Sequence, residues 1–286
     1  MGLIKPNGPD WAYCSHNLAS TPSETTPGLA NVTAGLSNAD GSAVTIMSAL
    51  AHDVEYLRLL IACSLTSGAV NDILMDLLID PAGGTSWSVL IPSIMCCKGD
   101  LAVGGGSPGS FSGYDFPVWI PAGASLGAQA RCAETTLTAP VIKPVLFAYG
   151  GNANPASWWC GQRVTAIGIN ASASTGQAHT PGSSGSFSTW TNLGSTLDTA
   201  CGALQWGVNG EGDGTFSTGR NQWEFGVASN RIGAPVLQFT TTSEAATWTP
   251  TGPIFKRLVA GTQLQVRATS AASPAQPIGV AAYAVH

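Results

Sequence analysis

The hydrophobic residues of this chain fall into short segments that are separated by glycine, proline and small polar residues. Between residues 264 and 269, for example, leucine, valine and alanine alternate with glutamine, arginine and threonine. This period of two is what a half-buried β-strand requires. Turn residues recur about every eight to twelve residues, which is typical of antiparallel sandwiches and barrels. The pattern therefore predicts an all-β chain.

Two segments of the first half also suit a helix. Residues 56–61 and 73–79 are both nearly continuous apolar runs. We predict strands in both places, because each run ends at a strong turn signal, at 66–68 and at 80–84, and neither carries the charged face of an amphipathic helix.

The order of features in the first half recurs in the second. Residues 119–126 and 144–150 match 257–264 and 277–284: an apolar pair, an Ala-Gly turn, a leucine, an arginine, a gap marked by proline and a strand with Ala-Tyr near its end. The copies lie roughly 135 residues apart, which is about one domain. This order favours an internal duplication with two hydrophobic cores.

We therefore predict two tandem jelly-roll-like antiparallel β-sandwich domains preceded by an extended N-terminal arm. The predicted parts are the arm at 1–30, the first sandwich at 31–151, a linker or interdomain plug at 152–175 and the second sandwich at 176–286. The arm is rich in proline, glycine and small polar residues. We expect it to embrace a neighbouring copy or a shell.

Charge is sparse, since charged residues make up 9% of the chain against roughly 25% in ordinary soluble domains. Residues 1–150 hold 5 Lys or Arg against 11 Asp or Glu, and residues 151–286 hold 6 against 5, so the balances are −6 and +1. Weak repulsion between copies suits assembly. Direct nucleic-acid binding and a membrane span are not expected, because the chain has neither a basic run nor a long apolar run.

Export through a signal peptide is not expected either, because residues 1–9 lack the cationic and apolar pattern of such a signal. A secreted β-protein of low charge is the alternative reading of the composition.

The seven cysteines form no CxxC pair, and no histidine stands at zinc-ligand spacing. Two readings stay open: buried thiols that pack as small apolar groups, or disulfides formed after release into an oxidising medium. Cys14, in the arm, is the candidate for an intermolecular disulfide.

Catalytic and metal-binding motifs are weak. Residues 104–109 satisfy both G-x-G-x-x-G and G-x-S-x-G, but no helix follows, so we interpret them as a loop. Asp72, Asp76 and Asp80 would share one face of a strand, where a turn role for Asp80 is favoured over a calcium site. The acidic loop at 210–215 is interpreted as a hairpin tip.

Acid and base residues form no recognisable catalytic set. The histidines are spread along the chain without a serine or cysteine elbow beside them. Pairing among carboxylates as in glycosidases has no positive support. We therefore expect a protein without enzymatic activity, cofactor or metal. The histidines and carboxylates considered are His16, His52, His179, His286, Asp53, Glu55, Asp213 and Glu224.

Nine tryptophans are the remaining chemical signal. Most should anchor a core or an interface, because an indole buries a large area and needs a single partner for its N–H. Trp11, Trp158 and Trp159 lie in predicted connectors, and we take them as the candidate ligand or interface aromatics. An exposed indole could stack on a sugar ring.

Arg131 and Arg267 occupy equivalent places in the two copies. We predict that both are structural and pair with backbone groups or carboxylates inside their own sandwich.

Several segments resemble accessory virion proteins of tailed bacteriophages, such as decoration, head-fibre, neck or tail proteins. In the first copy they are residues 76–84, 89–92 and 116–123 leading to Arg131, and in the second, more diverged copy 224–228, 234–238 and 258–261 leading to Arg267. The resemblance covers most of residues 40–286 loosely, leaves the arm unmatched and carries no catalytic residues.

The resemblance implies a non-enzymatic structural component of a virion, made in the host cytoplasm and assembled in multiple copies. Its expected partners are copies of itself and other virion proteins, with a homo-oligomer, preferably a trimer, as the assembly. The alternative is a carbohydrate-binding adhesin or receptor-binding module that contacts host-surface glycan through exposed tryptophans.

Overall fold

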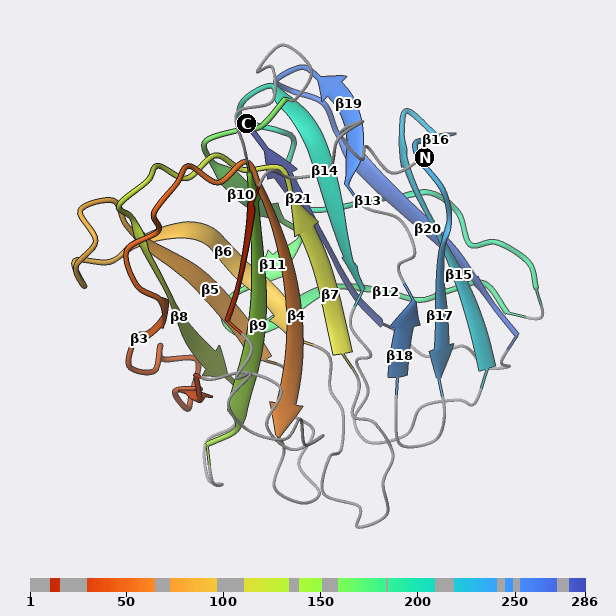
Figure 1. The fold of residues 1–286 in the computed structure, drawn as a ribbon. Helices are drawn as coiled ribbons and strands as arrows, with labels where there is room; N and C mark the ends of the chain where they lie inside the picture. The colour runs from red at the N-terminus through yellow and green to blue at the C-terminus, as the bar shows by residue number, and fades with distance from the viewer. Residues whose placement is uncertain are drawn as a thin grey trace.

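The computed structural model describes residues 11–15, 30–64, 73–96, 111–133, 139–150, 159–183, 185–208, 219–240, 245–248, 253–271 and 278–286. These residues form strands and loops without a helix, in four antiparallel sheets (Figure 1). The all-β class predicted from the alternating pattern is thereby confirmed. The segments at 56–61 and 73–79, which also suited a helix, are strands.

Two of the sheets belong to the first half of the chain and form what we call the first sandwich. One has the order β1-β9-β4-β7, with β2 also paired to β9, and the other has the order β3-β8-β5-β6. The strands are β1 (Trp11–Cys14), β2 (Val32–Thr33), β3 (Val44–Met47), β4 (Tyr56–Ser64), β5 (Ile73–Asp80), β6 (Ser88–Cys96), β7 (Phe111–Phe116), β8 (Ser125–Cys132) and β9 (Val141–Gly150).

The other two sheets form the second sandwich. One has the order β11-β12-β21-β14-β19, with β10 also paired to β21, and the other has the order β13-β20-β15-β17-β18, with β16 also paired to β15. The strands are β10 (Val164–Ile167), β11 (Ile169–Asn170), β12 (Thr175–His179), β13 (Thr191–Asn192), β14 (Cys201–Val208), β15 (Gly219–Val227), β16 (Asn230–Arg231), β17 (Val236–Thr240), β18 (Ala245–Trp248), β19 (Ile254–Leu258), β20 (Leu264–Ser270) and β21 (Ile278–Val285).

The last strand of the chain is buried on both of its faces. Ala281, Tyr283 and Val285 belong to the hydrophobic core of the first sandwich, whereas Ala282 and Ala284 belong to the core of the second. In Figure 1, β21 and β14 lie between the strands of the first sandwich and the sheet that holds β15, β17 and β20. One sheet therefore closes both cores, and the two sandwiches pack into one body.

Parts of the predicted arm and linker belong to these sheets. Within 1–30, β1 pairs with β9 and places Trp11 opposite Gly150, while residues 1–10 and 16–29 lie outside the described residues. Within 152–175, β10 pairs with β21 and β11 pairs with β12. The backbone hydrogen bonds of these short strands fix the described parts of both segments to the sandwiches.

Candidate functional site

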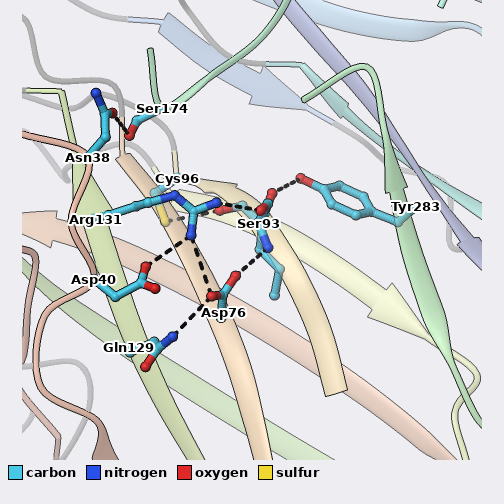
Figure 2. A network of polar contacts seen from close by, with 10 residues as sticks. Asn38, Asp40, Asp76, Ser93, Cys96, Gln129, Arg131, Ser174 and Tyr283 are labelled. Carbon is cyan, nitrogen blue, oxygen red and sulfur yellow. Dashed lines mark hydrogen bonds and ion pairs between the residues drawn. The ribbon is translucent and has the colours of Figure 1, made fainter. Parts of the chain in front are cut away.

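A network of hydrogen bonds and ion pairs crosses the contact between the two sandwiches (Figure 2). Tyr283 of β21 is fully buried, and its hydroxyl accepts a hydrogen bond from the Met95 N–H at 2.8 Å and donates one to the Ser93 carbonyl at 3.0 Å. Tyr114 donates to the Met95 carbonyl at 2.6 Å. Tyr283 of the second sandwich is thus the hydrogen-bond partner of two backbone groups in β6 of the first sandwich.

Ser93 lies at the centre of this network, and its backbone has a positive φ of 52°, which few non-glycine residues adopt. Its N–H donates to Asp76 Oδ1 at 2.6 Å, and its hydroxyl accepts from Arg131 Nη2 at 2.7 Å. Together with the bond from Tyr283, these contacts give a partner to the N–H, the hydroxyl and the carbonyl of Ser93.

Arg131 joins the network to the surface. Its Nη1 lies 3.0 Å from Asp40 Oδ1 and 3.5 Å from Asp76 Oδ2, and Asp76 also accepts from Gln129 at 3.2 Å. The guanidinium side chain is only 13% exposed. A mostly buried cation therefore faces two carboxylates, as Figure 2 shows, and one of them, Asp76, is buried.

Arg267 makes the corresponding contact in the second sandwich. Its Nη2 lies 2.6 Å from Glu224 Oε2, and Arg231 Nη1 lies 3.1 Å from Glu224 Oε1. Arg131 and Arg267 both meet carboxylates inside their own sandwich, which is the type of partner that the sequence predicted. Asp76 lies on β5 and Glu224 on β15, the strands next to β8 and β20, whereas Asp40 lies between β2 and β3.

Asp80 has the turn role that its place before Pro81 predicted. Its Oδ1 accepts from the Ala82 N–H at 2.9 Å and its Oδ2 from the Ser86 N–H at 2.8 Å. Asp72 lies outside the described residues, as do the loops at 104–109 and 210–215. Among the residues that the structure describes, no three His, Cys, Asp or Glu side chains come together as a metal site would require.

The three candidate aromatics have different positions. Trp158 lies outside the described residues, and for Trp11 only the backbone, in β1, is described. Trp159 is 41% exposed and lies against Gly202 of β14, where a Cβ atom would stand 2.4 Å from the indole ring. Of the three, Trp159 is therefore the one whose ring is shown at the surface.

The cysteines divide between surface and core. Cys14 is exposed at the end of β1, opposite Phe147 of β9, whereas Cys96, Cys132 and Cys201 are buried. Burial raises the pKa of the Cys201 thiol. Since only the thiolate is reactive, the buried thiol of Cys201 is a poor nucleophile at neutral pH. Cys97 lies outside the described residues.

An open pocket of about 560 Å³ lies at the β11–β12 edge of the sheet β11-β12-β21-β14-β19. Its walls are backbone and small or neutral side chains of β10 to β12, including Asn170 and Gln177. Both ends of the Gln177 amide are engaged, since Nε2 donates to the Asn192 carbonyl and Oε1 accepts from the Gly194 N–H. None of the residues that line this pocket is charged.

His179 is a buried titratable group in the second core. Its Nε2 lies 2.9 Å from Ser188 Oγ, and its ring lies edge-on to Trp223 with 5.8 Å between ring centroids. Burial lowers the pKa of His179 because the imidazolium is poorly solvated there. The fold therefore favours the neutral imidazole.

We expect this burial to make the protein less stable in mild acid. Since the folded-state pKa of His179 lies below its unfolded value, its contribution is complete above about pH 6.5 and is lost as the pH falls through the folded pKa. Denaturant unfolding at about pH 7.5 and about pH 5 should show a smaller drop in His179→Gln than in the wild type. Ser188→Ala should keep the pH dependence, and equal drops in the wild type and His179→Gln would contradict the assignment.

None of the described residues forms a helix that is long and apolar enough to cross a membrane.

Comparison with known proteins finds little. No protein-family model matches the chain, and no curated protein matches it. Among solved structures, one similar chain is titled "Structure of PNGF-II in P21 space group", with a TM-score of 0.36 and 11% sequence identity. The match covers 85% of this chain and 59% of that one, so this chain spans less than two thirds of its length. A likeness of this degree carries no inference about fold or activity.

Proposed function

We propose that the chain consists of two tandem jelly rolls that arose by duplication. The strand orders support this, because β1-β9-β4-β7 and β3-β8-β5-β6 correspond one for one to β12-β21-β14-β19 and β13-β20-β15-β17. In the first half the last strand, β9, lies between β1 and β4, and in the second half the last strand, β21, lies between β12 and β14. The two Greek keys of a jelly roll interlock in this way.

The arginine pairs support the same proposal. Arg131 and Arg267 lie on the corresponding strands β8 and β20, and their carboxylate partners Asp76 and Glu224 lie on the corresponding strands β5 and β15. The registers differ, since Glu224 is directly opposite Arg267 whereas Asp76 is two residues from the position opposite Arg131. An arginine–carboxylate pair on the same two strands of each sandwich is still unexpected for unrelated domains, because β-sheets do not require an ion pair there.

We further propose that the protein is a non-enzymatic structural component of a bacteriophage virion, such as a capsid decoration, neck or tail accessory protein, present in multiple copies. The observation that supports this is the sheet of β14 and β21, whose residues belong to both hydrophobic cores and so join the two sandwiches into one body. Jelly rolls serve both viral capsids and lectins. A body with 9% charged residues favours contacts between copies over a dissolved monomer.

Native mass spectrometry of the purified protein, with and without reductant, tests this proposal. We expect a closed homo-oligomer, with a trimer as the preferred state, because jelly-roll shell proteins act through contacts between copies. Cys14→Ser tests the proposed intermolecular disulfide, which should make part of the assembly sensitive to reductant. A soluble monomer that reductant leaves unchanged would contradict the structural role and favour a stand-alone binding module.

A binding module is the second candidate, because the Trp159 ring is 41% exposed and could stack on a sugar. Loss of glycan binding in Trp159→Ala would favour this candidate.

A further inference from the structure

The fourth sheet, β13-β20-β15-β17-β18, has one face in the second core and one face turned away from it. Trp223 and Phe225 of β15 are fully buried and belong to the core, and Phe225 stacks on Trp206 of β14 with 3.9 Å between ring centroids. Because side chains alternate along a strand, Glu224 and Gly226 lie on the other face. In Figure 1 this sheet is the layer of the second sandwich that lies away from the first.

The outer face of β15 and its neighbours carries more positive than negative charge. Glu224 is buried and receives both Arg267, through Nε at 2.8 Å and Nη2 at 2.6 Å, and Arg231, through Nη1 at 3.1 Å. One carboxylate therefore faces two guanidinium groups. Their side chains are 33% and 49% exposed, so donors of both arginines remain accessible to a ligand.

The matching cluster of the first sandwich has the opposite balance. There one guanidinium, Arg131, faces the two carboxylates Asp40 and Asp76 and is 13% exposed. The first cluster is therefore closed and acidic, while the second is open and basic. This contrast indicates that the second cluster differs from a purely internal ion pair.

Aromatic rings frame the second cluster. The Arg267 Cζ atom lies 4.6 Å from the ring centroids of both Phe187 and Trp190, and Phe187 is 37% exposed. Trp190 reaches over Gly226, where a Cβ atom would stand 2.8 Å from the indole ring. Gly226 is paired with Arg231 in the β15–β16 ladder. Because Gly226 has no side chain, the Trp190 indole can lie over this position, next to Arg267 and the strand of Arg231.

Neutral amides complete the surroundings. Gln265 donates to Asn192 Oδ1 at 3.0 Å and accepts from the Ser229 N–H at 2.7 Å. These bonds hold the loop after β15 and the edge strand β13 against β20, so the face is ordered around the arginines.

We propose that this face is a binding site for a carboxylate-bearing sugar residue of a polysaccharide. A guanidinium presents a planar pair of donors that matches a carboxylate, and an exposed aromatic ring packs against the C–H face of a pyranose. An acidic peptide would use the arginines but would have less need of the ring of Phe187. The proposal does not depend on the virion role, since a decoration protein and a free adhesin could both bind such a sugar.

Isothermal titration of the full chain with three probes tests the site: an oligogalacturonate, a hyaluronan oligomer and sialyllactose. The variants are Arg231→Gln and Phe187→Ala, and Arg163→Gln is the matched control, because Arg163 is also exposed in the second sandwich and pairs with Asp198. We expect Arg231→Gln to weaken binding of the best probe by about tenfold and Phe187→Ala by about threefold or more. Arg163→Gln should stay within about twofold.

Further arms separate the sources of the carboxylate and the position of the site. A methyl-esterified oligogalacturonate, which keeps the sugar ring and loses the charge, should bind weakly, and raising NaCl from about 0.05 M to about 0.5 M should weaken binding of the acidic probe. Equal binding of poly-glutamate, or no binding of any of the three sugars, would overturn the proposal. Loss of binding in Trp159→Ala with Arg231→Gln unaffected would also overturn it and place the sugar at Trp159.

Every variant needs to keep the thermal unfolding midpoint of the wild type within a few degrees. Arg231→Gln is suited to this, because Arg267 stays as the cation for the buried Glu224. The failure of this proposal is distinguishable from the failure of the virion proposal, because sugar binding is measured by titration and assembly by mass.

Discussion

Replacing Tyr283 by phenylalanine is expected to lower the free energy of unfolding by about 3 kcal/mol, although the ring is kept. The hydroxyl is the partner of the Met95 N–H and the Ser93 carbonyl, and all three residues are buried. Without it, two backbone groups remain in the interior with an unmade hydrogen bond, which costs about 1–3 kcal/mol each. The ring packing against Tyr114 and Phe116, at 5.6 Å and 5.9 Å between centroids, is unchanged.

The same substitution should also weaken the coupling between the sandwiches, because these two hydrogen bonds join β21 to β6. Denaturant unfolding followed by tryptophan fluorescence and by circular dichroism should coincide in the wild type and diverge in Tyr283→Phe. Tyr114→Phe is the matched control: it removes one hydrogen bond within the first sandwich and should cost about 1 kcal/mol without separating the transitions. A loss below about 0.5 kcal/mol in Tyr283→Phe would contradict the role given to its hydroxyl.

Much of the strand content follows from local patterns in the sequence. Residues 264–270 alternate between buried and half-buried positions, as the period of two predicted. Residues 73–80 and 278–285 are nearly continuous apolar runs, and both strands are buried along their whole length. A run without polar alternation is the signal of burial on two faces. That signal could have predicted that both faces of β21 are buried, but the sequence alone does not identify the sheet that covers the second face.

The polar sites were harder to predict because they depend on residues far apart in the chain. Arg131 could be matched with Arg267 from the repeated order of features, yet nothing local links Arg131 to Ser93 or Tyr283. Ser93 has no glycine-like sequence signal for its positive φ, since the bend is held by contacts from β5, β8 and β21. The arginine cluster at Glu224 likewise needs β15, β16 and β20 to lie side by side.

Arg131→Ala is expected to destabilise the protein by about 3 kcal/mol, and Arg267→Ala by about 1 to 2 kcal/mol. The difference follows from the composition of the two clusters. Removal of Arg131 leaves the buried Asp76 without a cation and the Ser93 hydroxyl without its donor. Removal of Arg267 leaves Glu224 with Arg231, which still donates at 3.1 Å.

The double variant Arg231→Gln/Arg267→Ala removes that reserve, so its loss should exceed the sum of its two single variants by about 1 kcal/mol or more, as expected for groups that share one partner. Arg163→Ala is the control, because its pair with Asp198 is exposed on both sides and should contribute little to stability. Urea unfolding of the whole series measures these differences. Neutral results for both Arg131→Ala and Arg267→Ala would end the view that the two arginines hold equivalent structural places. The expected inequality would show that the fold depends more on Arg131 than on Arg267, as the different compositions of the two clusters require.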